Sequence, residues 1–365
     1  MGFIEKYADL LVQYCVQVKP GDKVFISSTL LAEPLIREVY RAAYQAGAAL
    51  VESDLMFEQR EQLFLEYASD AALQTPPPLH LMAMETFDCY LHIRAPYQVH
   101  SNSALTPERA AMRREAMAGI NKAYFERTAT RALRRNLCQY PTESAASVAG
   151  MSLEEYTQFV FHACKLDQPD PQAAWLQVRA NQQHIVDHLN RCKQVRYRVG
   201  DSDIAFSTEG RIWMNSDGQT NMPSGEVYTS PVEDSVNGMI HFSFPCIYQG
   251  REVEGVTLWV KDGYIERWEA KSGGDFLDQI FAMPGARRFG EAAIGTNYDI
   301  RQLTKNILFD EKIGGTIHMA VGQSYFQTGG KNESAVHWDM ITDMTRGGEI
   351  WADGERIYEN GRFLI

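Results

Sequence analysis

The sequence has no long hydrophobic run, no excess of positive charge and no paired cysteine motif. No apolar stretch approaches the roughly 20 residues that cross a bilayer, so we expect no association with a membrane. The net charge of -12 argues against a nucleic-acid partner, because phosphate binding needs clustered Lys and Arg. The six cysteines are scattered without a CxxC pair, and the first residues lack the basic-then-apolar order of a signal peptide. Both features predict a cytoplasmic protein with reduced thiols.

The first part of the 365-residue chain alternates strand and helix signals. Residues 23–27 have the apolar pattern of a buried strand, and a helical face follows over residues 35–43. A second strand pattern lies at residues 49–51, and another at residues 89–93. This order and spacing predict a βαβ unit and a parallel sheet.

The middle of the chain is helical, and the last part is rich in short strands. Ser152 and Glu155 have the spacing of a capping box at a helix start. Residues 261–263 read Lys-Asp-Gly between two apolar runs, which predicts a β-hairpin. A chain of this length favours two domains. We therefore predict an α/β N-terminal domain over residues 1–190 and a strand-rich α+β C-terminal domain over residues 191–365.

Two histidines of the C-terminal part lie in strand-like segments that suit metal binding. His337 and Asp339 are two residues apart, so on a strand they point to the same side and can reach one metal ion or two adjacent ions. The alternative is a histidine with an orienting acid in an ordinary core. His318 lies in the glycine-bounded segment 314–322, where a histidine considered alone is more often a satisfied core residue than a ligand. Tyr325 follows it and can fold back over the same pocket.

Two glutamates, Glu226 and Glu291, lie in settings that differ from an ordinary charged surface. Glu226 stands in a loop that enters a strand. We predict a short helix around Glu291, where small neighbours let the carboxylate reach a close-packed site; an ion pair with Arg288 is the alternative. Glu311 is either a further site residue or part of a solvated acidic turn.

These residues form an oxygen-rich set with two imidazoles, which suits two neighbouring divalent ions. Such a pair of ions can share a hydroxide, polarise a peptide carbonyl and hold a free amine. The spacing does not show that the side chains converge. By themselves the residues support a metalloenzyme hypothesis and do not identify the reaction. The set is Glu226, Glu291, Glu311, His318, His337 and Asp339.

The sequence resembles the M29 family of metallopeptidases, the aminopeptidase S and aminopeptidase T group. The likeness runs over nearly the whole chain and is densest in its second half. Four ordered stretches carry it, and motifs of this length are improbable as a chance match. They are residues 223–231 (PSGEVYTSP), 285–291 (GARRFGE), 306–325 (NILFDEKIGGTIHMAVGQSY) and 329–340 (GGKNESAVHWDM).

The resemblance implies a metal-dependent aminopeptidase that removes N-terminal residues from short peptides. It implies two divalent ions per chain, of zinc, cobalt, manganese or magnesium, and a homodimer with a shielded cavity. Glu311 is then a further ligand or the general base, and Tyr325 donates a hydrogen bond to the oxyanion. The other ligands implied are Glu226, Glu291, His318, His337 and Asp339.

The chain departs from the longer members of the family in two ways. It is shorter, with a brief link between Tyr325 and His337, which bears on the shape and specificity of the substrate entrance. Its first motif reads Pro-Ser-Gly-Glu where longer members have Pro-Thr-Glu-Glu, but Glu226 is retained.

Two other functions remain open. His318, His337 and Asp339 alone form a two-histidine, one-carboxylate set that suits mononuclear non-haem iron, as in a ring-cleaving dioxygenase on the same scaffold. That function gives no role to Glu226 and Glu291. A non-catalytic peptide-binding or metal-binding relative is the second alternative, and it would require a lost ligand or a lost Tyr325, neither of which is seen.

Overall fold

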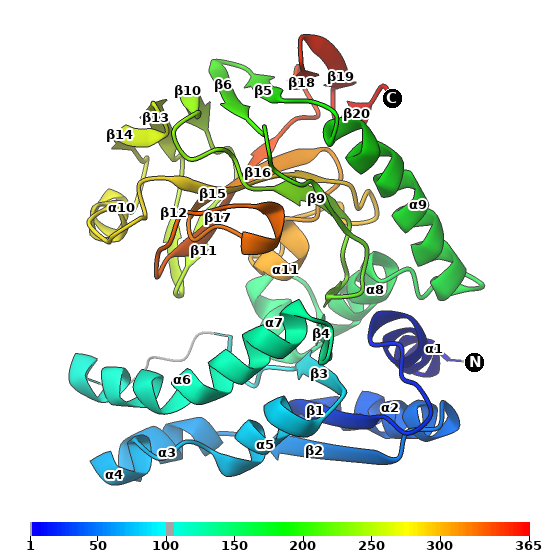
Figure 1. Ribbon diagram of the computed structural model, residues 1–365. Coiled ribbons are helices and arrows are strands. Elements are labelled where there is room, and N and C mark those ends of the chain that lie inside the picture. Colours follow the sequence, from blue (N-terminus) through cyan, green and yellow to red (C-terminus); the bar gives the residue numbers. More distant parts are fainter. Residues whose placement is uncertain (1, 100–105) are drawn as a thin grey trace. The chain divides into compact units, whose positions relative to one another are not determined.

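A computed structural model describes residues 2–99 and 106–365, and the chain forms two compact units (Figure 1). The first unit comprises residues 1–172 and 218–223, and the second comprises residues 173–217 and 224–365. Compact units do not by themselves show which segments fold independently, so the predicted domain boundary between residues 190 and 191 stays a prediction. Within the described residues, none of the helices combines the length and hydrophobicity needed to cross a membrane.

The first unit is built on a parallel sheet, which confirms the α/β prediction for this part of the chain. Its five strands follow the order β2-β1-β3-β4-β8, and every neighbouring pair is parallel. The βαβ unit is present, since α2 connects β1 to β2. The strands are β1 (Lys23–Thr29), β2 (Leu50–Met56), β3 (Cys89–Arg94), β4 (Arg134–Gln139) and β8 (Asn221–Met222).

Outside the sheet, the regular elements of the first unit are helices. The side chain of Ser152 and the side chain of Glu155 cap α8 reciprocally, as the capping box predicts. Phe25 of β1 packs with Met84 and Ile120, so α5 and α6 cover the same face of the sheet. The helices are α1 (Phe3–Asp9), which continues as a π-helical turn (Leu10–Cys15), α2 (Glu33–Gln45), α3 (Arg60–Tyr67), α4 (Asp70–Leu73), α5 (Pro78–Thr86), α6 (Pro107–Ala129), α7 (Glu143–Val148) and α8 (Leu153–Ala163), with a 3₁₀ turn at Leu30–Ala32.

The second unit contains two larger antiparallel sheets, which confirms its strand-rich α+β class. One sheet has the order β14-β13-β10-β6-β5-β18-β19-β20, the other β17-β16-β15-β9-β7, and β11 pairs with β12. The hairpin predicted at residues 261–263 joins β13 to β14. The eight-stranded sheet comprises β5 (Gln194–Val199), β6 (Ser202–Ser207), β10 (Asn237–His241), β13 (Thr257–Lys261), β14 (Tyr264–Glu269), β18 (Glu349–Ala352), β19 (Glu355–Glu359) and β20 (Arg362–Phe363).

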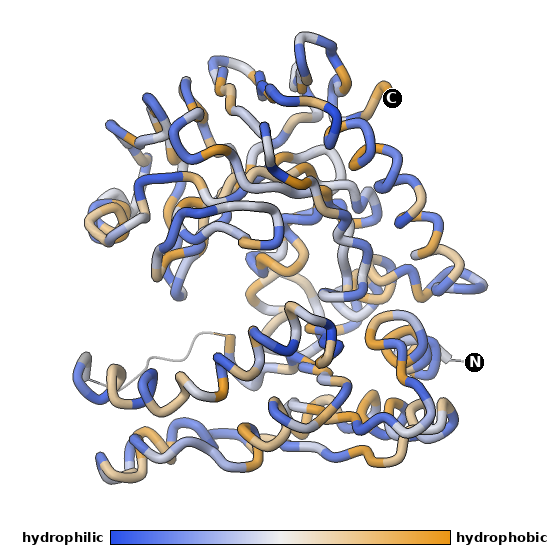
Figure 2. The backbone as a smooth tube through the Cα atoms, in the orientation of Figure 1, coloured by the Kyte–Doolittle hydropathy of each residue, from blue (hydrophilic) through white to orange (hydrophobic). Residues whose placement is uncertain are grey.

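The five-stranded sheet and the connecting helices complete this unit. In Figure 2 the colour along α9 alternates between hydrophilic and hydrophobic, as expected of a helix with one face on a core. The strands are β7 (Met214–Ser216), β9 (Glu226–Thr229), β15 (Phe289–Gly295), β16 (Thr316–Gly322) and β17 (His337–Asp343), with the pair β11 (Cys246–Tyr248) and β12 (Arg251–Val253). The helices are α9 (Pro171–Leu189), α10 (Gly274–Phe281) and α11 (Ile307–Asp310), with a 3₁₀ turn at Phe326–Thr328.

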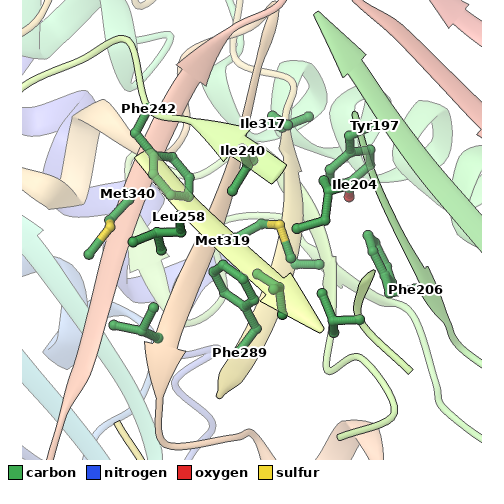
Figure 3. Close-up of a cluster of buried hydrophobic side chains, with 14 of the residues drawn as sticks. Tyr197, Ile204, Phe206, Ile240, Phe242, Leu258, Phe289, Ile317, Met319 and Met340 are labelled. Atoms are coloured by element: carbon green, nitrogen blue, oxygen red, sulfur yellow. The ribbon is translucent and has the colours of Figure 1, made fainter. Parts of the chain in front are cut away.

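A hydrophobic core joins the facing sides of these two sheets (Figure 3). Ile204 and Leu258 of the eight-stranded sheet belong to the same cluster of buried side chains as Ile317 and Met319 of β16. β15 and β16 are buried along their whole length. Any polar side chain that these two strands carry on the opposite face therefore lies away from water.

Candidate metal centre

One face of the five-stranded sheet gathers the acids and imidazoles named above. Successive side chains of a strand point to opposite faces, so the pairing register decides which residues share a face. His318 pairs with Ala293 of β15, and Ala320 pairs with Asp339 of β17. The two alanines are small, which leaves room between the polar side chains. The face opposite the hydrophobic core carries Glu226, Tyr228, Glu291, His318, His337 and Asp339.

A β-bulge places Glu291 on this face. The register between β15 and β16 shifts between Phe289 and Glu291. The extra residue lets Phe289 and Ala292 both join the hydrophobic core, although they are three positions apart, while Glu291 points the other way. Gly290 lies so close to Gln323 that a Cβ atom would stand 2.2 Å from the carbonyl oxygen. Only glycine fits there without a shift of the main chain.

The prediction of a short helix around Glu291 is wrong. The segment Gly-Glu-Ala-Ala has residues common in helices, but it forms a fully buried central strand, and tertiary packing overrides such local preference. The alternative ion pair with Arg288 is not what the structure shows: Nη1 of Arg288 donates to the carbonyl of Glu233 at 2.7 Å.

The short segment after α11 contributes an acid and a lysine. Glu311 follows α11 directly, and its carboxylate reaches the ligand atoms of His318 and Asp339. Lys312 is fully buried; its ammonium lies 2.7 Å from Oε1 of Glu226 and also bonds Oε1 of Glu311. The sequence analysis missed Lys312, because Asp-Glu-Lys is typical of a solvated turn. The one available signal was the neighbouring Gly314-Gly315 pair, which indicates a tight approach of the chain.

The carboxylates and imidazoles approach one another closely. Nε2 of His318 lies 3.4 Å from Oε2 of Glu226 and 3.6 Å from Oε1 of Glu291. Nε2 of His337 lies 3.2 Å from Oε2 of Glu291 and 3.6 Å from Oδ1 of Asp339. Three sets of potential ligand atoms each fall within 4.8 Å: Glu226, Glu291 and His318; Glu291, His337 and Asp339; and Glu311, His318 and Asp339.

Several of these atoms are buried without a hydrogen-bond partner among the described residues. They are Oε2 of Glu226, Nε2 and Nδ1 of His318, and Oδ1 of Asp339. Leaving a buried polar atom unsatisfied is costly, and a divalent cation would satisfy the two carboxylate oxygens and Nε2 of His318. The other nitrogen of His318 does not face the same site and stays without a partner among the described residues. Nδ1 of His337 donates to the carbonyl of Gln323 at 2.9 Å, which leaves Nε2 available as a ligand. The donor set fits a divalent metal; the role of each residue as a ligand stays a prediction.

Electrostatics couple the acids to the imidazoles. Burial by itself lowers the pKa of an imidazole, but the facing carboxylates of Glu291 and Glu226 outweigh it and raise the pKa of His318 to about 9. Asp339 and Glu291 likewise outweigh burial and raise the pKa of His337 to about 10. Burial would raise the pKa of Glu291, yet the two imidazoles hold it below its usual value. In the absence of metal the imidazoles are therefore protonated at neutral pH.

Tyr325 lies at the edge of this cluster. Its hydroxyl is 3.4 Å from Nε2 of His337, and its ring packs edge-on against Tyr228 with centroids 5.3 Å apart. Burial is the first cause that raises the pKa of Tyr325 well above its usual value, so the phenol stays protonated and is a hydrogen-bond donor. Tyr325 thus lies beside His337, and its role in catalysis stays a prediction.

Comparison with known proteins finds relatives that match nearly the whole length of this chain. The sequence model of the family described as thermophilic metalloprotease (M29) matches residues 3–363. Aminopeptidase 2 of Geobacillus stearothermophilus is 29% identical, over 99% of this chain and 98% of that protein. Aminopeptidase AmpS of Bacillus subtilis (strain 168) is 27% identical over the same shares. The solved structure of wild-type AmpT from Thermus thermophilus superposes with a TM-score of 0.86 at 23% identity, covering 100% of this chain and 99% of that one, and shows the same fold.

Proposed function

This chain belongs to the M29 family of metalloproteases, and from this membership we propose that it is a metal-dependent aminopeptidase that removes N-terminal residues from short peptides. The observation that carries the proposal is the meeting of four carboxylates and two imidazoles, from segments far apart in sequence, in one cluster that is half-buried to buried. Several of their atoms have no partner among the described residues.

We assign two divalent ions per chain, of zinc, cobalt, manganese or magnesium. Glu291 and Asp339 each belong to two of the three ligand sets, and a carboxylate shared in this way could hold two ions and offset their repulsion. When bound, the two ions supply a nucleophilic hydroxide at neutral pH and a Lewis acid for the scissile carbonyl. The residues assigned as ligands are Glu226, Glu291, Glu311, His318, His337 and Asp339.

Glu311 and Tyr325 have the properties required of the proton shuttle and the oxyanion donor. Burial is the main cause that raises the pKa of Glu311, to about 8, in the protein without metal. Where Glu311 acts as the general base and not as a further ligand, its carboxyl group can exchange a proton near neutral pH. In the proposed reaction it takes a proton from the attacking water and passes it to the leaving amine. The protonated phenol of Tyr325 donates to the oxyanion of the tetrahedral intermediate.

Similarity to aminopeptidases favours a substrate with a free N-terminal amine. The cluster holds four carboxylates, and two of them pair with the ammonium of Lys312. A carboxylate beside the metal ions could accept hydrogen bonds from the α-amine of a peptide. This preference would restrict cleavage to the first peptide bond.

The dioxygenase alternative explains the cluster less well. A mononuclear iron site uses only two histidines and one carboxylate. Oε2 of Glu291 lies 3.2 Å from Nε2 of His337, so a second acid stands inside that set. A non-catalytic relative would need no phenol beside the histidines, whereas Tyr325 is there.

We also propose a cytoplasmic homodimer whose subunits shield the site. The support is the resemblance to the family described above and the scattered cysteines of the chain. Sedimentation analysis of the purified protein measures the oligomeric state directly. A monomer at all accessible concentrations would contradict the dimer and leave the proposed chemistry intact.

Metal analysis and a substrate panel test the function together. We expect two divalent ions per chain and hydrolysis of aminoacyl-arylamides and dipeptides that carry a free amine. The same substrates with an acetylated amine are the matched control and should resist cleavage. One iron per chain with oxygen consumption on hydroxylated aromatic substrates would support the dioxygenase instead.

A further inference from the structure

Lys312 is a positive charge built into the candidate metal centre. Its side chain is 1% exposed, and its two ion-pair partners, Glu226 and Glu311, are both assigned as metal ligands. Its ammonium lies 2.7 Å from Oε1 of Glu226 and also bonds Oε1 of Glu311, so the positive charge stands between two carboxylates. An ammonium at this place repels divalent cations, and burial leaves that repulsion little screened by water or salt.

The lysine touches only part of the cluster. Two of the three ligand sets contain one of its partners: Glu226 in the set with Glu291 and His318, and Glu311 in the set with His318 and Asp339. The third set, Glu291, His337 and Asp339, contains neither. The lysine also occupies Oε1 of Glu226, so this carboxylate has only Oε2 left for a metal ion.

We propose that Lys312 makes the two metal positions unequal, an inference that rests on the two-ion function proposed above. The ion held by Glu291, His337 and Asp339 binds tightly. The ion that uses His318 with Glu226 or Glu311 binds weakly and exchanges with metal in solution.

Lys312→Met tests whether the charge of Lys312 makes the two metal positions unequal, because methionine has a similar length and no charge. Two effects oppose each other in the variant: the repulsion disappears, and Glu226 and Glu311 lose a partner that orients them. The main chain at Glu226 remains held, since Gln182 donates to its main-chain carbonyl at 3.2 Å. The repulsion between an ammonium and a dication in a buried site is the stronger of the two effects. The dissociation constant of the weakly bound ion should therefore fall by about tenfold or more, while that of the tightly bound ion changes little.

The experiment titrates metal-free protein with Co²⁺ and follows heat and visible absorption. For the native chain we expect two binding steps that differ by about tenfold or more in dissociation constant. His337→Ala should remove the tight step and so identify it. Lys305→Met is the matched control, because Lys305 pairs with Glu252 at 2.8 Å on the surface; both steps should stay as in the native chain.

The outcomes separate this inference from the function on which it rests. Two equal steps in the native chain, or a weak step that Lys312→Met leaves unchanged or weakens, would overturn the role of Lys312. Saturation at one ion per native chain would contradict the two-ion function itself. If Lys312→Met does not fold, the native titration and the His337→Ala titration still decide whether the positions are unequal as assigned.

Discussion

The main-chain carbonyl of Gln323 accepts a hydrogen bond from Nδ1 of His337 at 2.9 Å. In the neutral ring this contact keeps the proton on Nδ1, and it directs Nε2 toward Glu291 and Asp339. Gly290 of the bulge lies against the same carbonyl. The bulge thus serves two residues at once: it turns Glu291 into the cluster and leaves space for the group that orients His337.

We expect Gly290→Ala to disturb both residues. A Cβ atom 2.2 Å from the carbonyl of Gln323 forces a main-chain shift, which should cost about 1–3 kcal/mol of stability and weaken metal binding. Thermal unfolding and Co²⁺ titration measure the two effects. Gly274→Ala is the control, because a Cβ atom there has nothing within 4 Å. Equal behaviour of the two variants would show that the close approach is unimportant.

Removing one carboxylate or imidazole from the cluster should abolish turnover. Glu291→Gln keeps the shape and loses the charge, and His318→Ala loses the imidazole; each should lower kcat/KM by about a thousandfold or more, since metal ions supply several kcal/mol to the transition state. Glu252→Gln, on the surface, should retain activity. Circular dichroism checks that the fold persists. Substantial activity of the metal-saturated Glu291→Gln variant would contradict the assignment.

Tyr325→Phe should act on the chemical step. The ring contact with Tyr228 is kept, but the donor to the oxyanion is lost, so we expect kcat to fall by about 10²-fold with little change in KM. Tyr67→Phe, a change at an exposed tyrosine, is the control. A rise in KM at constant kcat would instead indicate a role in substrate binding.

The stability of the metal-free protein should fall as the pH rises from neutral to about 10. The pKa values of His318 and His337 are raised, to about 9 and about 10, above an unfolded value near about 6.5. Groups with raised pKa values contribute stability that is complete below the unfolded pKa and is lost as the pH passes the folded pKa. Metal ions displace these protons, so the metal-loaded protein should lose less stability over the same pH range.

Thermal unfolding at several pH values, with and without metal, measures this difference. His241→Gln is the control, since His241 lies outside the cluster and bonds Thr257. Parallel pH profiles of the metal-free and metal-loaded protein would show that His318 and His337 are not the titrating groups.

Local features of the chain were predicted well from sequence. The capping box at Ser152, the hairpin at residues 261–263 and the first βαβ unit depend on neighbouring residues, and all are confirmed. The four motif stretches also contain the acids and imidazoles that the structure brings together. Glu291 was placed in the wrong element because a bulged strand of small residues has no local alternation to reveal it.

The sequence by itself determined which residue types are available and the class of fold, because caps, turns and apolar periodicity act over a few residues. Tertiary structure alone decided that β9, β15, β16 and β17 lie side by side, and so which acids share one buried face. It also decided that Lys312, in a segment typical of a solvated turn, is buried between two acids. Long-range packing determines which strands are neighbours. A charged side chain is stable in the interior only where residues distant in sequence pair with it.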